Sequence, residues 1–199
     1  MKRCLAIAVA VLLAYQWPAA ALSSALSSPT VVWVGLDYSM VRMFGSGDFT
    51  NPDQIFPSMF SQWNALYLKE KIEDLGKRLH KQVIPDTMGI IEINKQAQTS
   101  QVVREDGDYA KYVTASHITP DDIANAVRSY KLSQDTGLGL VFIVDRLVRL
   151  HETGCLYVVY FDIASREVLK SERKIAKTGG RGFRNHWFGF IKDITGTLK

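Results

Sequence analysis

The sequence predicts one α/β domain in which helices pack on a mixed sheet of about five strands, in the order β-α-β-α-β-β-β-α. Three strand-like runs follow one another in the C-terminal half, and the middle one is apolar at every position from 156 to 161. In the N-terminal half, helical patterns separate the β-branched runs. Strands that first alternate with helices and then form hairpins are typical of a mixed sheet with helices on its faces.

The first 21 residues predict a signal peptide. Lys2 and Arg3 are a basic start, the run 4–15 is apolar, and the alanines at 19–21 offer a cleavage site. The run is shorter than the ~20 residues that cross a bilayer, so no transmembrane segment is expected. Residues 22–29 predict a flexible N-terminal segment, and 30–199 the single domain. A lipid-bearing cysteine would follow the apolar run, whereas Cys4 stands at its start, so we expect export to the periplasm or the exterior without a lipid anchor.

Cleavage at this site would leave 178 of the 199 residues, enough for one hydrophobic core. Loss of Lys2 and Arg3 would reduce the 24 basic side chains to 22, against 20 acidic ones. That balance is not typical of a nucleic-acid-binding protein. Cys155 would be the single remaining cysteine, and its place in the most apolar strand predicts a buried, unreactive thiol.

The N-terminal half predicts two strands and one long helix. Thr30–Asp37 is apolar and β-branched, which indicates a buried strand, and the glycines and aspartate of 39–51 indicate a loop. A helix is expected from Asn51 or Phe56 to Leu79, with Gly76 as an alternative break. Its apolar stripe has spacings of three and four and comprises Phe60, Trp63, Tyr67, Leu68, Ile72, Leu75 and Leu79. Met88–Asn94 predicts the second strand.

The C-terminal half starts with a helix that Thr119 caps and Pro120 and two aspartates begin. Residues 138–150 and 155–163 then predict an antiparallel hairpin, and a charged edge strand follows from Glu167. In the first of these strands we expect Leu140, Phe142 and Val144 on one face and Val141, Ile143 and Leu147 on the other. Arg146 and Arg149 predict that its far end emerges into solvent.

The best candidate for a ligand site is the glycine-rich turn before the last helix. Its residues are Gly179, Gly180, Arg181, Gly182, Arg184 and His186. Backbone N–H groups at a helix start, assisted by arginines, can hold an anion or a phosphate group. The alternative is a tight turn that docks the helix through Phe183, Trp187 and Phe190. Neither the dinucleotide-binding nor the P-loop motif fits the turn.

Basic side chains are concentrated between 166 and 184. They are Arg166, Lys170, Arg173, Lys174, Lys177, Arg181 and Arg184, against Glu167 and Glu172. This run can be a surface for acidic partners or anionic lipid headgroups, or simply the solvated face of an edge strand.

No catalytic or metal-binding constellation stands out. The four histidines lack the spacing of metal ligands, so neither a metal nor a cofactor is expected. Asp37, Asp145 and Asp162 lie in or at the ends of predicted strands, and with His186 they leave a hydrolase-type enzyme open as an alternative. Catalytic residues are otherwise unknown, because no Ser/His/Asp or Cys/His set is recognisable.

The C-terminal half resembles a group of uncharacterised exported bacterial proteins. The resemblance lies in the segment from Asp162 to Arg173, which fits D-x-x-x-x-x-V-L-x-x-E-R, and in the run G-G-x-G-F-R-N-[YH]-W at Gly179–Trp187. The first half matches that group more loosely. A weaker, fold-level resemblance is to the domain of curli-secretion and penicillin-binding-protein-activator lipoproteins, although Ile163–Arg166 lacks its Thr-Gly turn. Fold likeness alone does not define function.

These observations predict a non-catalytic, protein-interaction module of the bacterial cell envelope. The expected partner is another envelope protein, with self-association as an alternative, and neither nucleic acid nor a membrane span is expected. Peripheral membrane contact stays open. The alternatives are a small-anion or phosphate binder that uses the turn 179–184, and a hydrolase that uses the strand-end carboxylates.

Overall fold

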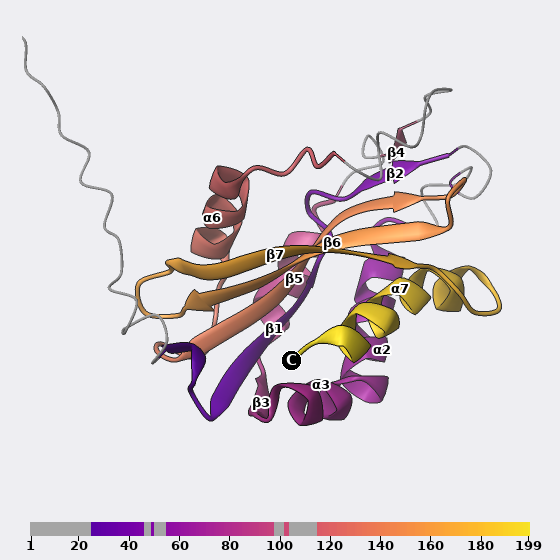
Figure 1. Cartoon of the computed structure of the whole chain (residues 1–199). Helices are drawn as coiled ribbons and strands as arrows, with labels where there is room; N and C mark the ends of the chain where they lie inside the picture. The colour runs from indigo at the N-terminus through magenta and orange to yellow at the C-terminus, as the bar shows by residue number, and fades with distance from the viewer. Residues whose placement is uncertain (1–24, 46–48, 50–54, 98–101, 104–114) are drawn as a thin grey trace, which may run out of the picture.

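The computed structural model describes residues 25–45, 49, 55–97, 102–103 and 115–199 (Figure 1). The predicted signal peptide and the start of the predicted flexible segment lie outside these residues. The rest of that segment is tied to the domain. Lys81 Nζ donates hydrogen bonds to the carbonyl oxygens of Leu26, at 2.8 Å, and Ser28.

Within the described residues the chain forms one seven-stranded mixed sheet with helices on both faces, which confirms the predicted α/β class. The strands are β1 (Thr30–Asp37), β2 (Arg42–Phe44), β3 (Gln82–Pro85), β4 (Val102–Val103), β5 (Leu138–Val148), β6 (Thr153–Asp162) and β7 (Val168–Lys177). The helices are α2 (Ser58–Glu70), α3 (Ile72–Leu79), α4 (Met88–Asn94), α6 (Pro120–Ser129) and α7 (Phe183–Thr197).

Strand β5 is the centre of the sheet. On one side it pairs in parallel with β1 along its first half and with β2 at its far end, and β3 and β4 extend these two pairs outward. On its other side it pairs antiparallel with β6, which pairs antiparallel with β7. The predicted three-strand C-terminal unit is therefore confirmed.

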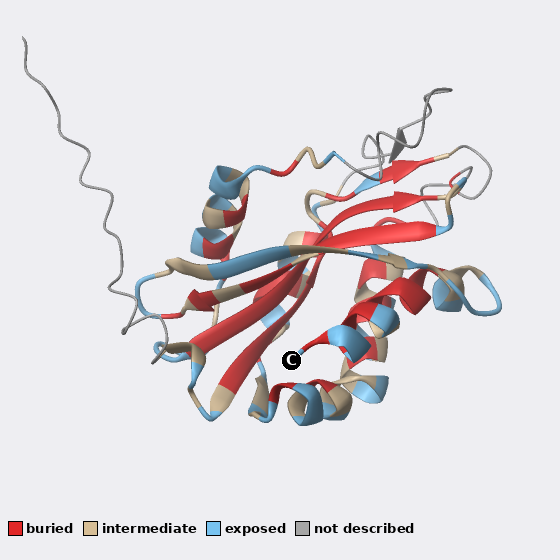
Figure 2. Ribbon diagram, in the orientation of Figure 1, coloured by how far each residue is buried: buried red, intermediate tan, exposed pale blue. Residues whose placement is uncertain are grey.

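The two faces of the sheet have separate cores. Helices α2, α3 and α7 cover one face, where Trp33, Phe142 and Trp187 are buried. Helices α4 and α6 cover the other, where Val141 and Phe161 are buried. Every residue of β5 is buried, because helices cover the strand on both faces (Figure 2). Cys155 is buried as predicted, and burial raises the pKa of its thiol to about 11.

The predicted strand at Met88–Asn94 is wrong, because these residues form helix α4. A short isoleucine-rich run does not distinguish strand from helix, and here the buried residues include Ile90 and Asn94, one helical turn apart. The strand that pairs with β1 is β3 instead. It has only four residues, ends in a proline, and was not predicted from the pattern.

Asn94 and Asn64 explain why α4 and α2 lie where they do. β3 stops opposite Trp33, so the next residues of β1 lose their strand neighbour on that side. Asn64 replaces it, since its Oδ1 accepts from the Leu36 N–H at 2.8 Å and its Nδ2 donates to the Leu36 carbonyl at 3.0 Å. Asn94 donates to the same carbonyl and accepts from the Tyr38 N–H, both at 2.8 Å. Two side-chain amides thus satisfy the buried backbone.

The long predicted helix is divided into α2 and α3 at Lys71 rather than at Gly76. Gly76 lies inside α3, where a Cβ would be 3.1 Å from the Lys81 carbonyl oxygen. The predicted cap of α6 is confirmed. Thr119 Oγ1 accepts from the Asp122 N–H at 3.2 Å, and the Asp122 carboxylate accepts from the Thr119 N–H at 2.9 Å.

A β-bulge changes the end of β5. The register with β6 shifts between Val144 and Arg146, so Leu147 packs on the face of Leu140 and Phe142 rather than on the predicted opposite face. The prediction that Arg146 marks a solvent-exposed end is also wrong, because its side chain is only 3% exposed. The β5–β6 turn follows at residues 149–152.

Candidate functional site

The glycine-rich turn folds back against its own helix. The Gly179 N–H donates to the His186 carbonyl at 3.0 Å, and Thr178 Oγ1 lies 2.9 Å from His186 Nε2. Gly180 has φ +124°, and a Cβ there would be 2.8 Å from the Asn185 carbonyl oxygen. Glycine is thus required at 180 both for its backbone angle and for space. These contacts are those of a turn that docks a helix.

The residues predicted to bind an anion come together only in part. Gly182 is the N-cap of α7, and within the described part of the chain this position shows no side-chain capping hydrogen bond. Arg181 and Arg184 are both exposed on either side of Gly182, whereas His186 is half-buried against Trp187, with ring centroids 5.2 Å apart. The backbone geometry suits an anion.

Strand β7 divides the basic run between its two faces. Lys170 and Lys174 point to the same side as Glu172. The Glu172 carboxylate forms ion pairs with both lysines, and its Oε2 lies 3.9 Å from Lys170 Nζ. These pairs lower the pKa of Glu172, chiefly through the hydrogen bond from Lys174. Arg173 points to the other face and contacts Asp145 instead. The face with the lysines is open to solvent over the middle of the strand (Figure 2).

Asp145 is the centre of a buried charge cluster on the opposite face. Its carboxylate is fully buried and accepts hydrogen bonds from Arg146 at 3.1 Å and Arg173 at 2.9 Å. His117 Nδ1 lies 3.0 Å from the same carboxylate. His117 Nε2 lies 2.9 Å from the Met40 carbonyl oxygen. Burial alone would raise the pKa of Asp145, but the contacts with His117, Arg146 and Arg173 lower it below its usual value.

The three strand-end carboxylates each have separate structural partners. Asp37 accepts hydrogen bonds from Tyr130 Oη at 2.6 Å and from the Ser39 N–H at 2.8 Å. Asp162 accepts from the N–H and hydroxyl of Ser165 in the β6–β7 turn, at 2.8 and 2.9 Å. Among the described residues, no hydrogen bond or ion pair joins Asp37, Asp145 or Asp162 to His186.

The outer edge of β7 is the most extended backbone surface of the described chain. The strand has ten residues and pairs with β6 alone among the described strands. The other terminal strands, β3 and β4, have four and two residues. Alternate residues of an edge strand direct their N–H and C=O groups outward, so β7 offers about five such residues to a further strand.

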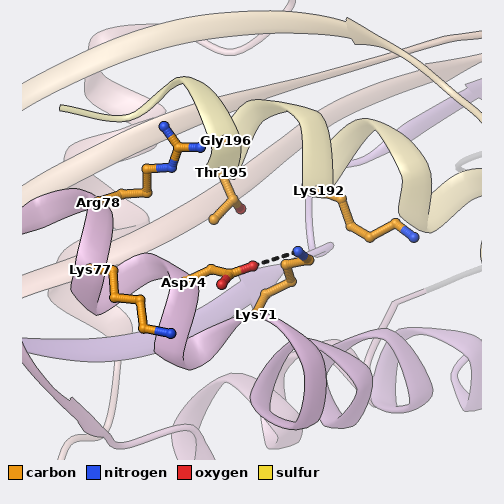
Figure 3. A pocket seen from close by; sticks show the side chains of 7 residues that line it. All are labelled: Lys71, Asp74, Lys77, Arg78, Lys192, Thr195 and Gly196. Atoms are coloured by element: carbon orange, nitrogen blue, oxygen red, sulfur yellow. Dashed lines mark hydrogen bonds and ion pairs between the residues drawn. The ribbon is translucent and has the colours of Figure 1, made fainter.

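A basic pocket between α3 and α7 was not predicted from the sequence. It has a volume of about 320 Å³ and lies beside Lys71, Asp74, Lys77, Arg78, Lys192 and Thr195 (Figure 3). Two other pockets lie at the β5–β6 turn and under the start of α6, with volumes of about 470 and 430 Å³. Arg181, Arg184 and His186 line none of these three.

Comparisons of the chain with protein-family models, with curated proteins and with solved structures found no match. In the described part of the chain, no helix combines the length and apolar character needed to cross a membrane. The same residues contain no group of three or more histidine, cysteine, aspartate or glutamate side chains placed to hold a metal ion.

Proposed function

We propose that this chain is an exported, non-catalytic domain of the bacterial cell envelope that binds another protein, and that the partner adds an extended, acidic segment to the edge of β7. The observation that supports this proposal is the long outer edge of β7 beside a mainly basic face. Addition of a strand to an exposed sheet edge is a common mode of peptide recognition.

The backbone of β7 provides the affinity in this proposal. Among the described strands, β7 pairs with β6 alone, through antiparallel backbone hydrogen bonds. A bound strand would extend the sheet, since β5 and β6 already form a continuous hydrogen-bonded support. Backbone hydrogen bonds alone do not distinguish one peptide sequence from another, so the side chains of β7 must select the partner.

The charges on β7 select for an acidic segment. Lys170, Lys174 and Lys177 are at least partly exposed, and Glu172 is the single carboxylate within the strand. A second copy of β7 would place lysines near lysines, which is destabilising across neighbouring strands. A segment with glutamates or aspartates at alternate positions would instead pair with the lysines and satisfy the backbone edge.

The test uses a fluorescein-labelled ten-residue peptide that alternates glutamate with valine, and follows fluorescence anisotropy on titration with residues 22–199. A peptide with lysine in place of glutamate is the charge control. Two further glutamate peptides carry N-methyl groups on either the odd or the even residues, because a strand uses only one set of N–H groups on each edge. We expect saturable binding of the glutamate peptide, and loss of binding in one N-methylated peptide but not in the other.

Matched protein variants separate the β7 edge from general electrostatic attraction. Lys170→Glu/Lys174→Glu should weaken binding roughly tenfold or more, since each cross-strand charge pair contributes about 0.2–1 kcal/mol and like charges cost a similar amount. The control variant Arg128→Glu/Lys131→Glu makes the same charge change at two exposed positions, one within α6 and one just after it. Equal weakening by both variants, or equal binding of both N-methylated peptides, would contradict strand addition at β7.

An anion site at the glycine turn is the second candidate, because the described residues show no side-chain capping hydrogen bond at Gly182 and Arg181 and Arg184 flank it. Its test is thermal stabilisation by phosphate, nucleotides and sugar phosphates in the parent chain and in Arg181→Ala/Arg184→Ala. Stabilisation that the variant loses would support it, and an unchanged melting temperature in both proteins would exclude it. No comparable observation favours the hydrolase alternative.

A further inference from the structure

A mainly apolar pocket lies between helix α6 and the sheet, on the face of β7 opposite to Lys170 and Lys174. Helix α6 packs against β7 (Figure 1). The pocket has a volume of about 430 Å³ and is lined by Ile118, Pro120, Ile123, Tyr157, Val168 and Ser171. None of these six described residues carries a charge, so the pocket suits an apolar group better than an ionic one.

Hydrogen bonds hold the walls of this pocket in place. Tyr157 Oη donates to the Ile118 carbonyl at 3.4 Å, which joins β6 to the segment before α6. The capping box of Thr119 and Asp122 fixes the first turn of α6, where Pro120 lies. A site whose walls are already ordered binds a side chain at a smaller entropic cost.

The register of β7 shows which of its residues face the open edge. The Thr178 N–H donates to the Glu152 carbonyl at 2.7 Å, next to the pair of Lys177 and Thr153. Hydrogen-bonded pairs alternate along an antiparallel ladder, so every second residue from Thr178 back to Lys170 bonds to β6. The backbone groups that face outward therefore belong to Ser171, Arg173, Ile175 and Lys177.

An added strand would direct alternate side chains to the α6 face of the sheet. Ser171 lines the pocket on that face, and Arg173 contacts Asp145 there. A residue directly opposite another on a neighbouring strand has its side chain on the same face. The partner residue opposite Ser171 thus points to the face that contains the pocket, whereas its two neighbours point to the side of Lys170 and Glu172.

We propose that the partner strand carries a large apolar side chain opposite Ser171, and that this side chain fills the pocket beside α6. The inference rests on the proposed strand addition at β7 and specifies which segment the edge selects. Acidic residues opposite Lys170 and Lys174, with a neutral residue opposite Glu172, fix the register, because like charges directly opposite each other are destabilising. The recognised segment has two acidic residues four positions apart, with the large apolar residue directly beside the one that faces Lys170.

The experiment compares three fluorescein-labelled ten-residue peptides by fluorescence anisotropy on titration with residues 22–199. All three have glutamate at the third and seventh positions and threonine at the other odd positions. The first has valine at every even position, and the other two have phenylalanine in place of valine at the fourth or at the sixth position. With the glutamates opposite Lys170 and Lys174, one of these two positions lies opposite Ser171 and the other opposite Arg173.

One phenylalanine peptide should bind roughly tenfold more tightly than the valine peptide, because its ring buries more apolar area in the pocket. The other should bind no more tightly than the valine peptide. Which of the two gains affinity gives the direction of the added strand, since the fourth and sixth positions exchange places when the strand is reversed. Equal binding of the two phenylalanine peptides would overturn the pocket assignment.

Matched variants test whether the preference for phenylalanine arises in this pocket. Ser171→Leu fills the pocket from β7 without changing the backbone edge, so it should abolish the preference and retain binding of the valine peptide. Gln82→Leu adds the same side chain to an exposed position of the edge strand β3 and should retain the preference. A preference that survives Ser171→Leu, or that both variants lose, would refute the pocket while leaving strand addition intact. Absence of binding by all three peptides would contradict strand addition itself, and this inference with it.

Discussion

The Asp145→Asn substitution tests how the β5 bulge is held. Asp145 is fully buried and contacts Arg146, which is 3% exposed, and Arg173, which is 17% exposed. Removal of one partner from a buried ion pair costs about 3–5 kcal/mol. Because Arg173 and the 20%-exposed His117 can regain contact with water, we expect the lower end of that range, about 3 kcal/mol.

The measurement is urea unfolding followed by tryptophan fluorescence, which Trp33, Trp63 and Trp187 report from the core. A loss of about 3 kcal/mol corresponds to a fall in Tm of roughly 6–12 °C for a domain of this size. A loss of free energy of unfolding below ~1 kcal/mol, the range of exposed pairs, would refute the reasoning. A double-mutant cycle with Arg173→Gln then separates the coupling between the two side chains from other effects.

The pH dependence of this cluster has a definite sign. The folded-state pKa of Asp145 is lowered, so its contribution is fully present above the unfolded-state pKa of about 3.9 and is lost as the pH falls through the folded-state pKa. The difference in stability between the parent chain and Asp145→Asn should therefore be constant from pH 7 to about 5 and shrink below about pH 4. A difference that grows toward low pH would contradict the assignment.

Three further predictions concern packing and reactivity. Asn64→Ala removes the buried amide that pairs with the N–H and C=O of Leu36, and urea unfolding should show a loss of about 2–4 kcal/mol in the free energy of unfolding. A loss under ~1 kcal/mol would mean that water replaces the amide. Gly139→Ala would place a Cβ 2.4 Å from the Phe161 ring and should lower the free energy of unfolding by about 1–3 kcal/mol. The control Gly196→Ala, whose Cβ would meet no atom within 4 Å, should leave the stability unchanged or raise it slightly in the same assay. Cys155 should react with a thiol reagent at pH 8 only at the rate of unfolding, since its thiol is buried and has a pKa of about 11. Rapid labelling of the folded chain would instead show that the strand opens locally.

The three C-terminal strands could be predicted from the sequence, because the apolar patterns and the turn residues there indicate the same strand boundaries. The apolar run of β6, the short turns on either side of it and the charged edge strand each have a local signal. The cap at Thr119 is equally local. Features that depend on contacts between distant segments were missed. β3 is a four-residue strand that β1 stabilises, and α4 is helical because Asn94 and Ile90 must face the same neighbours.

The candidate sites show the same division. The basic character of β7 could be predicted from its composition, but its division into an open lysine face and a buried Arg173–Asp145 contact required the register with β6. The burial of the Arg146 side chain depends on a β-bulge in β5, and no residue in this segment indicates a bulge from the sequence. The α3–α7 pocket could not be predicted, because Arg78 and Lys192 are distant in sequence and each resembles an ordinary surface charge on its own helix. Only the packing of the two helices places both residues beside one cavity.

The central claim is that a partner strand pairs with the outer edge of β7. It is tested most directly by amide hydrogen exchange of the isotope-labelled chain, measured by NMR with and without the alternating glutamate peptide. Strand addition predicts that alternate amides of 168–177 become protected, while the amides of the same strand that already bond to β6 change little. Binding of the peptide with protection confined to residues outside β7, or with no change in the exchange of β7, would contradict the claim.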